Sequence, residues 1–232
     1  MFGVPVVKHG VNGELRQKGK VAELALGYGG GPNAMLAFGA DKLGMTDEEI
    51  ANTVALWREK SPRIVALWKR LERAAIRCVV TGAAIPLPSL HVAFQMENGI
   101  LWMTLPSGRR IAYYGAKYEE GTGKFNKDRK VLSYMGKEQQ TGKWARIETW
   151  GGKLVENLVQ ATARDCLRDS MLALTAAGYD IRAHVHDEVI ITEPVGGRSV
   201  DEVCELMGRT PDWAEGLPLR ADGYACDFYM KD

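Results

Sequence analysis

The sequence lacks several features that would indicate particular classes of protein. It has no run of eighteen apolar residues, so it predicts no transmembrane helix. Its N-terminal segment has no basic stretch followed by a long apolar core, so it predicts no secretion signal. The four cysteines are scattered without a C-x-x-C pair, which favours neither a disulfide framework nor a zinc knuckle. We therefore expect reduced thiols and a cytoplasmic protein.

A charge excess of either sign is also lacking, because 30 Lys and Arg residues face 29 Asp and Glu residues. The charges are nevertheless segregated. The segment from Arg58 to Arg77 holds seven basic and two acidic residues, and the segment from Asp187 to Asp232 holds eleven acidic and four basic ones. Such segments are typical of solvated helix faces, although a neutral protein can still present a basic surface to phosphates.

Helical patterns dominate the first part of the chain. They predict helices over 12–28 and 33–41, from Thr46 to near Lys60, and onward from Ser61–Pro62. Asn12 is the expected N-cap of the first helix. Thr46 and Glu49 have the spacing of a capping box, and Pro62 suits a first helical turn.

After a break at Gly82–Pro88 the apolar period changes from helical to alternating. The patterns predict strands over 89–96, 100–105, 109–114 and 130–135, a polar loop over 115–129, a long helix over 149–177, strands over 180–185 and 189–193, a helix over 199–208, and a last strand over 222–230. This order predicts an α+β fold, with a helical part over 1–88 and a part with a small antiparallel sheet over 89–232.

The first candidate site lies on the helix predicted over 12–28. Arg16, Lys20, Leu24 and Tyr28 recur every four residues, which places them on neighbouring turns of one helix side. An arginine fork and a lysine point charge one turn apart can hold a polyphosphate, and an aromatic ring can stack on a base. The alternative is a surface helix with ordinary charges.

The second candidate site is the turn His186-Asp187-Glu188 between two apolar strands. Carboxylates at such a tip offer the oxygen ligands that Mg²⁺ prefers, whereas the alternative is an exposed polar turn. A third possibility is a transition-metal hydrolase site, because His184 and His186 share one strand face. That site would need further ligands, and the remaining histidines are His9 and His91.

The long helix over 149–177 carries a polar stripe. Its members are Lys153, Asn157, Gln160, Arg164 and Arg168. An amphipathic helix with one solvated face explains this stripe without a function.

In their order, these segments resemble family A DNA polymerases of phage and prophage type. R-x3-K-x7-Y-G from Arg16 resembles motif B, V-H-D-E at Asp187 resembles motif C, and Gln160–Asp165 resembles the palm helix before motif C. Thr104–Arg109 is also similar to phage members of the family.

The resemblance implies roles for the individual residues. Arg16 and Lys20 would contact the triphosphate, Lys20 would assist the departure of pyrophosphate, and Tyr28 would lie near the templating base. Leu24 stands where the family has Phe or Tyr, so the usual sugar selectivity is not implied. Asp187 and Glu188 would bind metal, and His186 would lie near the primer terminus. Gln160 would contact DNA, as would Asn157, which is one residue out of register with the family pattern.

The resemblance further implies template-directed addition of dNTPs to a primer 3′-end on primer-template DNA, with two Mg²⁺ ions. Residues 1–88 would form the fingers and 89–232 a partial palm. Motif A, of D-Y-S-x-x-E type, supplies the other metal-binding aspartate of the family and lies upstream of motif B. Only fifteen residues precede Arg16, and none is an aspartate. We therefore expect the isolated chain to be inactive without an N-terminal polypeptide that supplies motif A; the alternative is an inactive truncated remnant.

Overall fold

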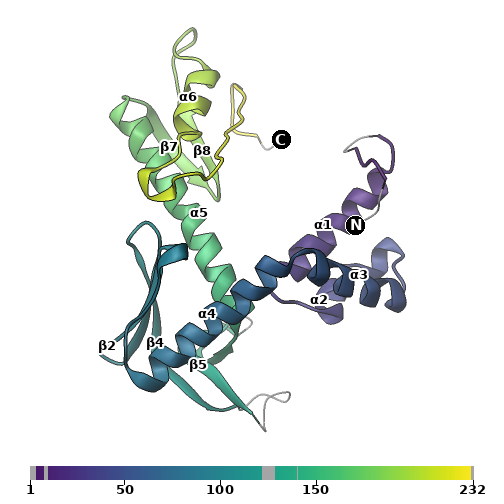
Figure 1. The fold of residues 1–232 in the computed structure, drawn as a ribbon. Helices are drawn as coiled ribbons and strands as arrows, with labels where there is room; N and C mark the ends of the chain where they lie inside the picture. Colours follow the sequence, from purple (N-terminus) through teal and green to yellow (C-terminus); the bar gives the residue numbers. More distant parts are fainter. Residues whose placement is uncertain (1–3, 8–9, 122–128, 140, 231–232) are drawn as a thin grey trace. The chain divides into compact units, whose positions relative to one another are not determined.

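The computed structural model describes residues 4–7, 10–121, 129–139 and 141–230 (Figure 1). It consists of two compact units. The first comprises Met1–Leu87, Ala93–Met103 and Ile111–Asn157, and the second comprises Pro88–Val92, Thr104–Arg110 and Leu158–Asp232. Helices and antiparallel sheets are both present, which confirms the predicted α+β class.

The first unit begins with helices that the sequence patterns predicted. They are α1 (Gly13–Leu26), α2 (Pro32–Ala37), α3 (Asp47–Lys60) and α4 (Pro62–Thr81), with a short 3-10 turn η1 over Asp41–Leu43. The capping box is confirmed, because Glu49 N donates to Thr46 Oγ1 at 3.2 Å and Thr46 N donates to Glu49 Oε2 at 2.8 Å. Asn12 holds the predicted N-cap position of α1 but does not cap the helix with its side chain. Its side chain makes no capping bond to the described part of α1 and donates instead to the Pro5 carbonyl at 2.9 Å.

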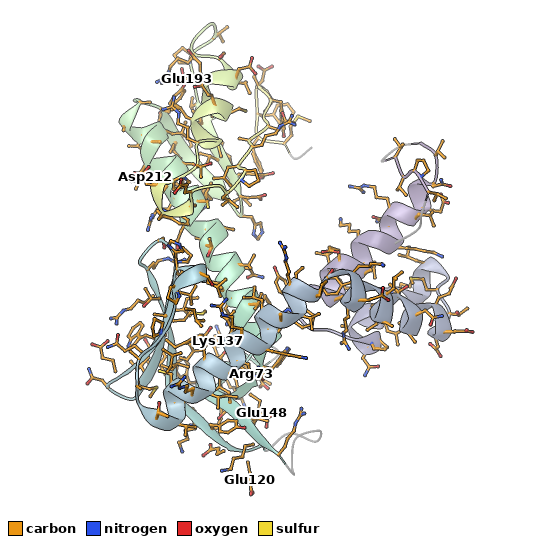
Figure 2. All side chains as sticks on the ribbon, viewed as in Figure 1. Arg73, Glu120, Lys137, Glu148, Glu193 and Asp212 are labelled. Atoms are coloured by element: carbon orange, nitrogen blue, oxygen red, sulfur yellow. The ribbon has the colours of Figure 1, made fainter. Side chains whose placement is uncertain are left out.

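An antiparallel sheet of six strands follows in simple sequential order. Its strands are β1 (Ile85–Leu87), β2 (Val92–Glu97), β3 (Ile100–Thr104), β4 (Arg110–Glu120), β5 (Lys130–Lys137) and β6 (Trp144–Thr149), with a 3-10 turn η2 over Pro88–Leu90. Asn98 and Gly99 join β2 to β3 with φ values of 51° and 77°, the left-handed geometry that two-residue hairpins prefer. Figure 2 labels Glu120, Lys137 and Glu148, which come from the neighbouring strands β4, β5 and β6.

The loop prediction over 115–129 is wrong in its first part, because β4 continues to Glu120. The register between β4 and β5 shifts after Tyr114, where Gly115 has a φ of 53°. A glycine in this conformation lets a strand bulge and continue instead of ending. Residues 122–128 lie outside the described residues. Strand β6 was not predicted, although R-I-E-T at 146–149 alternates polar and apolar residues as a strand does.

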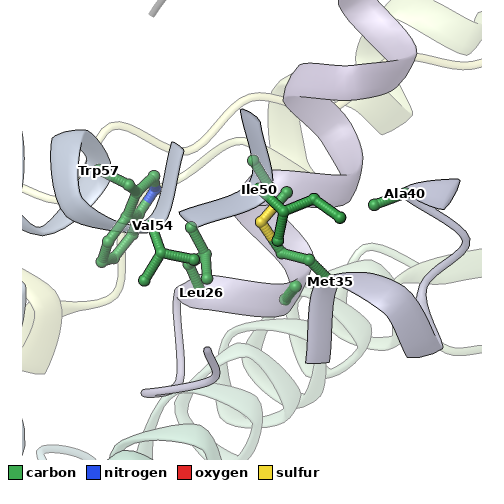
Figure 3. Close-up of a cluster of buried hydrophobic side chains, with 8 residues drawn as sticks. Leu26, Met35, Ala40, Ile50, Val54 and Trp57 are labelled. Carbon is green, nitrogen blue, oxygen red and sulfur yellow. The ribbon is translucent and has the colours of Figure 1, made fainter. Parts of the chain in front are cut away.

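The α1–α4 region is held by a cluster of buried apolar side chains. Its members are Ala22, Ala25, Leu26, Met35, Ala40, Ile50, Val54 and Trp57 (Figure 3). Leu26, Met35 and Ala40 are fully buried and come from α1, α2 and the turn that follows α2. Burial of this kind stabilises a domain by roughly 25 cal/mol per Å² of apolar surface. The cluster therefore fixes the buried side of α1 and leaves the opposite side free.

Helix α5 (Gly151–Ala176) and the elements after it complete the chain. They are β7 (Asp180–Val185), β8 (Glu188–Thr192), α6 (Val200–Met207) and the 3-10 turn η3 (Asp212–Ala214). Strands β7 and β8 form a sheet of their own. The last strand predicted over 222–230 is wrong, because these residues form no strand and run exposed along their described length. In the part of the chain that the structure describes, no helix is long and apolar enough to cross a membrane.

Candidate functional site

Helix α1 presents the first group of predicted site residues on its free side. Ala22, Ala25 and Leu26 are buried, whereas Arg16 and Lys20 are exposed. The apolar Leu24 is 50% exposed beside them. Residues one turn apart have Cβ atoms about 5–6 Å from one another, so the two cations can act on one anion. The sequence pattern predicted this grouping, although Tyr28 lies in the turn after α1 and is half-buried.

Two tryptophans hold the C-terminal end of α1. Trp57 Nε1 donates to Glu23 Oε2 at 2.8 Å, and Trp68 Nε1 donates to the Gly27 carbonyl at 3.1 Å. The rings are stacked with centroids 5.9 Å apart. This separation is close to the helical pitch of about 5.4 Å, so the pair matches acceptors one turn apart. The two tryptophan hydrogen bonds together clamp the segment that leads into Tyr28. No sequence motif predicted these two bonds.

The turn that contains Tyr28 also lies against the start of α5. A Cβ on Gly152 would lie 1.9 Å from the Tyr28 carbonyl oxygen, and a Cβ on Gly151 would lie 2.1 Å from the Trp68 carbonyl oxygen. Real Cβ atoms do not approach oxygen so closely, so only glycine permits this backbone packing. The sequence signal for this close backbone packing is the glycine pair Gly151-Gly152 near the start of the predicted long helix.

The second group lies at the tip of the β7–β8 hairpin. Val185 pairs with Glu188, which leaves His186 and Asp187 as a two-residue turn. His186 has a φ of 53°, a left-handed conformation that is uncommon for residues with a side chain. The register also shifts between Ile181 and Ala183. A left-handed residue is the ordinary geometry of a two-residue hairpin, so this φ accounts for the tight turn that exposes His186 and Asp187.

The Asp187 and Glu188 carboxylates are exposed, and among the described residues neither forms a hydrogen bond or an ion pair. Their oxygens are the hard donors that Mg²⁺ prefers, so the chemistry of this donor pair fits the ion. Two neighbouring carboxylates do not by themselves form a complete metal-binding site. Among the described residues, no three His, Cys, Asp or Glu side chains gather as a metal site, and the hydrolase hypothesis gains no support.

The predicted DNA contacts on α5 differ in their surroundings. Gln160 is exposed, as a contact to nucleic acid would require. Asn157 is half-buried, and its Nδ2 donates to the Tyr113 hydroxyl at 3.0 Å. Burial raises the pKa of Tyr113, and the Asn157 hydrogen bond partly opposes that rise. The Asn157 amide therefore has a structural partner within the first unit.

A buried network in the second unit was not predicted from the sequence. Asp165 has a side chain that is only 2% exposed, and it accepts from Ser107 Oγ and from Arg109 Nε, each at 2.5 Å. Arg109 Nη2 also donates to the Ala161 carbonyl at 2.8 Å. The network ties the β3–β4 turn to the part of α5 that carries Gln160. The turn Pro106-Ser107-Gly108-Arg109 was the sequence signal that could have indicated this network.

The structure thus gathers Arg16, Lys20 and Leu24 on α1, and His186, Asp187 and Glu188 at one turn. Helix α1 belongs to the first unit and the hairpin to the second.

Neither a protein-family model nor a solved structure matches the chain. A curated protein from Bacillus phage SP02, named DNA polymerase, is 47% identical to it over 232 residues. The match covers 100% of this chain and 35% of the relative. The chain therefore spans about a third of the length of the phage polymerase to which it is similar.

Proposed function

We propose that this chain is part of a phage-type, family A DNA polymerase that adds dNTPs to a primer 3′-end under the direction of a template. The observation that carries the proposal is the 47% identity, over the whole chain, to a protein named DNA polymerase. The exposed cations of α1 and the exposed carboxylates of the hairpin each support it, because a nucleotidyl transfer needs both kinds of group. Its substrates would be primer-template DNA and dNTPs.

Helix α1 would bind the incoming nucleotide. The Arg16 guanidinium can donate two parallel hydrogen bonds to phosphate oxygens, and the Lys20 ammonium can place a compact charge beside them. In its second role Lys20 would stabilise charge on the leaving pyrophosphate. Tyr28, held by the clamped turn, would lie near the templating base, and Leu24 would offer an apolar contact near the sugar. Among the described residues neither cation forms an ion pair, and Glu23, three residues from Lys20, accepts a hydrogen bond from Trp57.

Asp187 and Glu188 would hold the metal. When bound, Mg²⁺ supplies activation of the primer 3′-oxygen and neutralises charge on the departing pyrophosphate. The turn exposes both carboxylates to solvent, so their oxygens are open to a metal ion. His186 would face the primer terminus, and Gln160 would contact the primer-template duplex.

Further polymerase sequence would complete the site. Two features support this part of the proposal: the chain corresponds to 35% of its phage relative, and β7–β8 pairs with no third strand among the described residues. A lone two-stranded hairpin is only marginally stable in water, and its open edges can accept another strand. An N-terminal portion that carries motif A would supply the second aspartate. The alternative is an inactive remnant, in which no added portion restores synthesis.

The proposal is tested by replacing Lys20 with alanine in the chain combined with the N-terminal polymerase portion. Loss of a charge-assisted phosphate contact costs about 1.5–3 kcal/mol, so kcat/KM for the dNTP should fall roughly 10- to 100-fold in a primer-extension assay. Lys18→Ala is the matched control, because it removes the same charge two residues away on another side of α1. Equal effects of the two substitutions would contradict a specific nucleotide contact.

A further inference from the structure

Helix α4 carries a basic stripe along its exposed side. The stripe consists of Arg63, Lys69, Arg70, Arg73 and Arg77, all of which are exposed (Arg73 is labelled in Figure 2). Leu71, Ala74, Ala75 and Cys78 form the buried side of the same helix. Arg63, Arg70 and Arg77 are seven residues apart, which is close to two full turns, so they follow one line along the helix. The only acid within α4 is Glu72, which is half-buried.

The stripe is not arranged to stabilise the helix. Among the described residues, none of its five side chains forms an ion pair or a hydrogen bond. Arg73 instead has Lys69 and Arg77 four residues away and Arg70 three residues away, which are the spacings at which helix side chains meet. Like charges at these spacings repel each other and weaken a helix. Cations gathered without partners on one exposed face form a positive surface that can attract a polyanion.

We propose that the α4 stripe binds the phosphodiester backbone of DNA as a contact surface additional to the candidate polymerase site. From Arg63 to Arg77 the helix rises about 21 Å, and each strand of duplex DNA carries one charge per roughly 3.4 Å of helix axis, so the stripe is long enough to contact several phosphates of one strand. Four of the five cations are arginines, whose planar forks bind phosphate oxygens in pairs. The identification of the polyanion as DNA rests on the proposed function, and the contact is independent of base sequence.

The test measures binding of a fluorescent primer-template duplex to the 232-residue chain by anisotropy across a salt series. Each phosphate contact contributes about 0.9 to the slope of log affinity against log salt. The triple variant Arg70→Gln/Arg73→Gln/Arg77→Gln should therefore lower the slope by about 2–3 and weaken binding at least about tenfold in moderate salt. Its melting temperature should be unchanged or higher, because the like-charge repulsion is relieved.

The matched control is Lys42→Gln/Lys60→Gln/Arg209→Gln, which removes three exposed positive charges elsewhere. This control should keep the wild-type slope. Equal slopes for the stripe variant and wild type would overturn the inference, as would equal losses in both triple variants, since net charge alone would then explain binding. Binding of an acidic polypeptide that depends on the stripe, without any stripe-dependent binding of DNA, would also overturn it.

The outcome is separable from that of the proposed function. If primer extension requires Asp187 but the stripe variant keeps the wild-type slope, this inference fails alone. If the slope falls in the stripe variant but no extension ever depends on Asp187, the stripe is upheld and the polymerase proposal fails.

Discussion

Replacement of Arg109 with alanine is expected to lower the free energy of unfolding by about 3–5 kcal/mol, because removal of one partner leaves the other as a buried, uncompensated charge. Among the described residues, Asp165 would keep only the Ser107 hydroxyl as a donor, and its side chain is 2% exposed. For a chain of this size each kcal/mol lowers Tm by about 2–4 °C, so thermal unfolding should shift by roughly 6–20 °C.

A surface pair provides the matched control for this prediction. Arg209 contacts Glu205 at 3.3 Å with both side chains largely exposed, and such pairs contribute only about 0–1 kcal/mol. Arg209→Ala should therefore leave Tm almost unchanged. The double variant Arg109→Met/Asp165→Leu should recover much of the loss, because an apolar pair needs no compensation. A small effect of Arg109→Ala would show that water compensates Asp165.

The second large effect is expected from Gly152→Ala. The new Cβ would lie 1.9 Å from the Tyr28 carbonyl oxygen, so either α5 or the Tyr28 turn must move. Overpacking of this kind costs about 1–3 kcal/mol. In the assembled polymerase the same displacement should raise KM for the dNTP, because Tyr28 and the end of α1 would shift together.

Gly31→Ala is the control, since its added Cβ would meet no atom closer than 3.9 Å. It should change both Tm and KM little. If Gly152→Ala leaves KM for the dNTP unchanged while lowering Tm, the turn is structural and does not position the nucleotide site.

Local patterns in the sequence predicted much of the fold. The Thr46–Glu49 capping box formed as expected, because its hydrogen bonds depend on residues three apart in the sequence. Asn12 holds the predicted N-cap position, but its side chain donates to the Pro5 carbonyl and does not cap the helix. Strand β4 extends beyond its predicted end because Gly115 allows a bulge. The residues over 222–230 do not form the predicted strand, because a strand requires a pairing partner.

Local sequence patterns could not predict contacts between residues that are far apart in the sequence. The donation from Trp68 to Gly27 joins residues 41 apart, and the bond from Ser107 to Asp165 joins residues 58 apart. Both depend on how the elements pack together, which residue spacing alone does not encode. The exposed position of Arg16 and Lys20 followed from helical periodicity. The roles of these residues, and of Asp187, remain proposals that rest on chemistry and similarity.

The most direct test of the polymerase proposal is template-directed dNTP incorporation by the chain combined with the N-terminal portion and Mg²⁺, with Asp187→Asn compared against Asp180→Asn. Asp180 lies on the same hairpin and contacts Arg182 at the surface, so its substitution should keep nearly the wild-type rate. Loss of a metal-ligating carboxylate removes several kcal/mol of transition-state stabilisation, so Asp187→Asn should lower the rate at least about a hundredfold. Incorporation that persists in Asp187→Asn at the rate of Asp180→Asn would contradict the proposal.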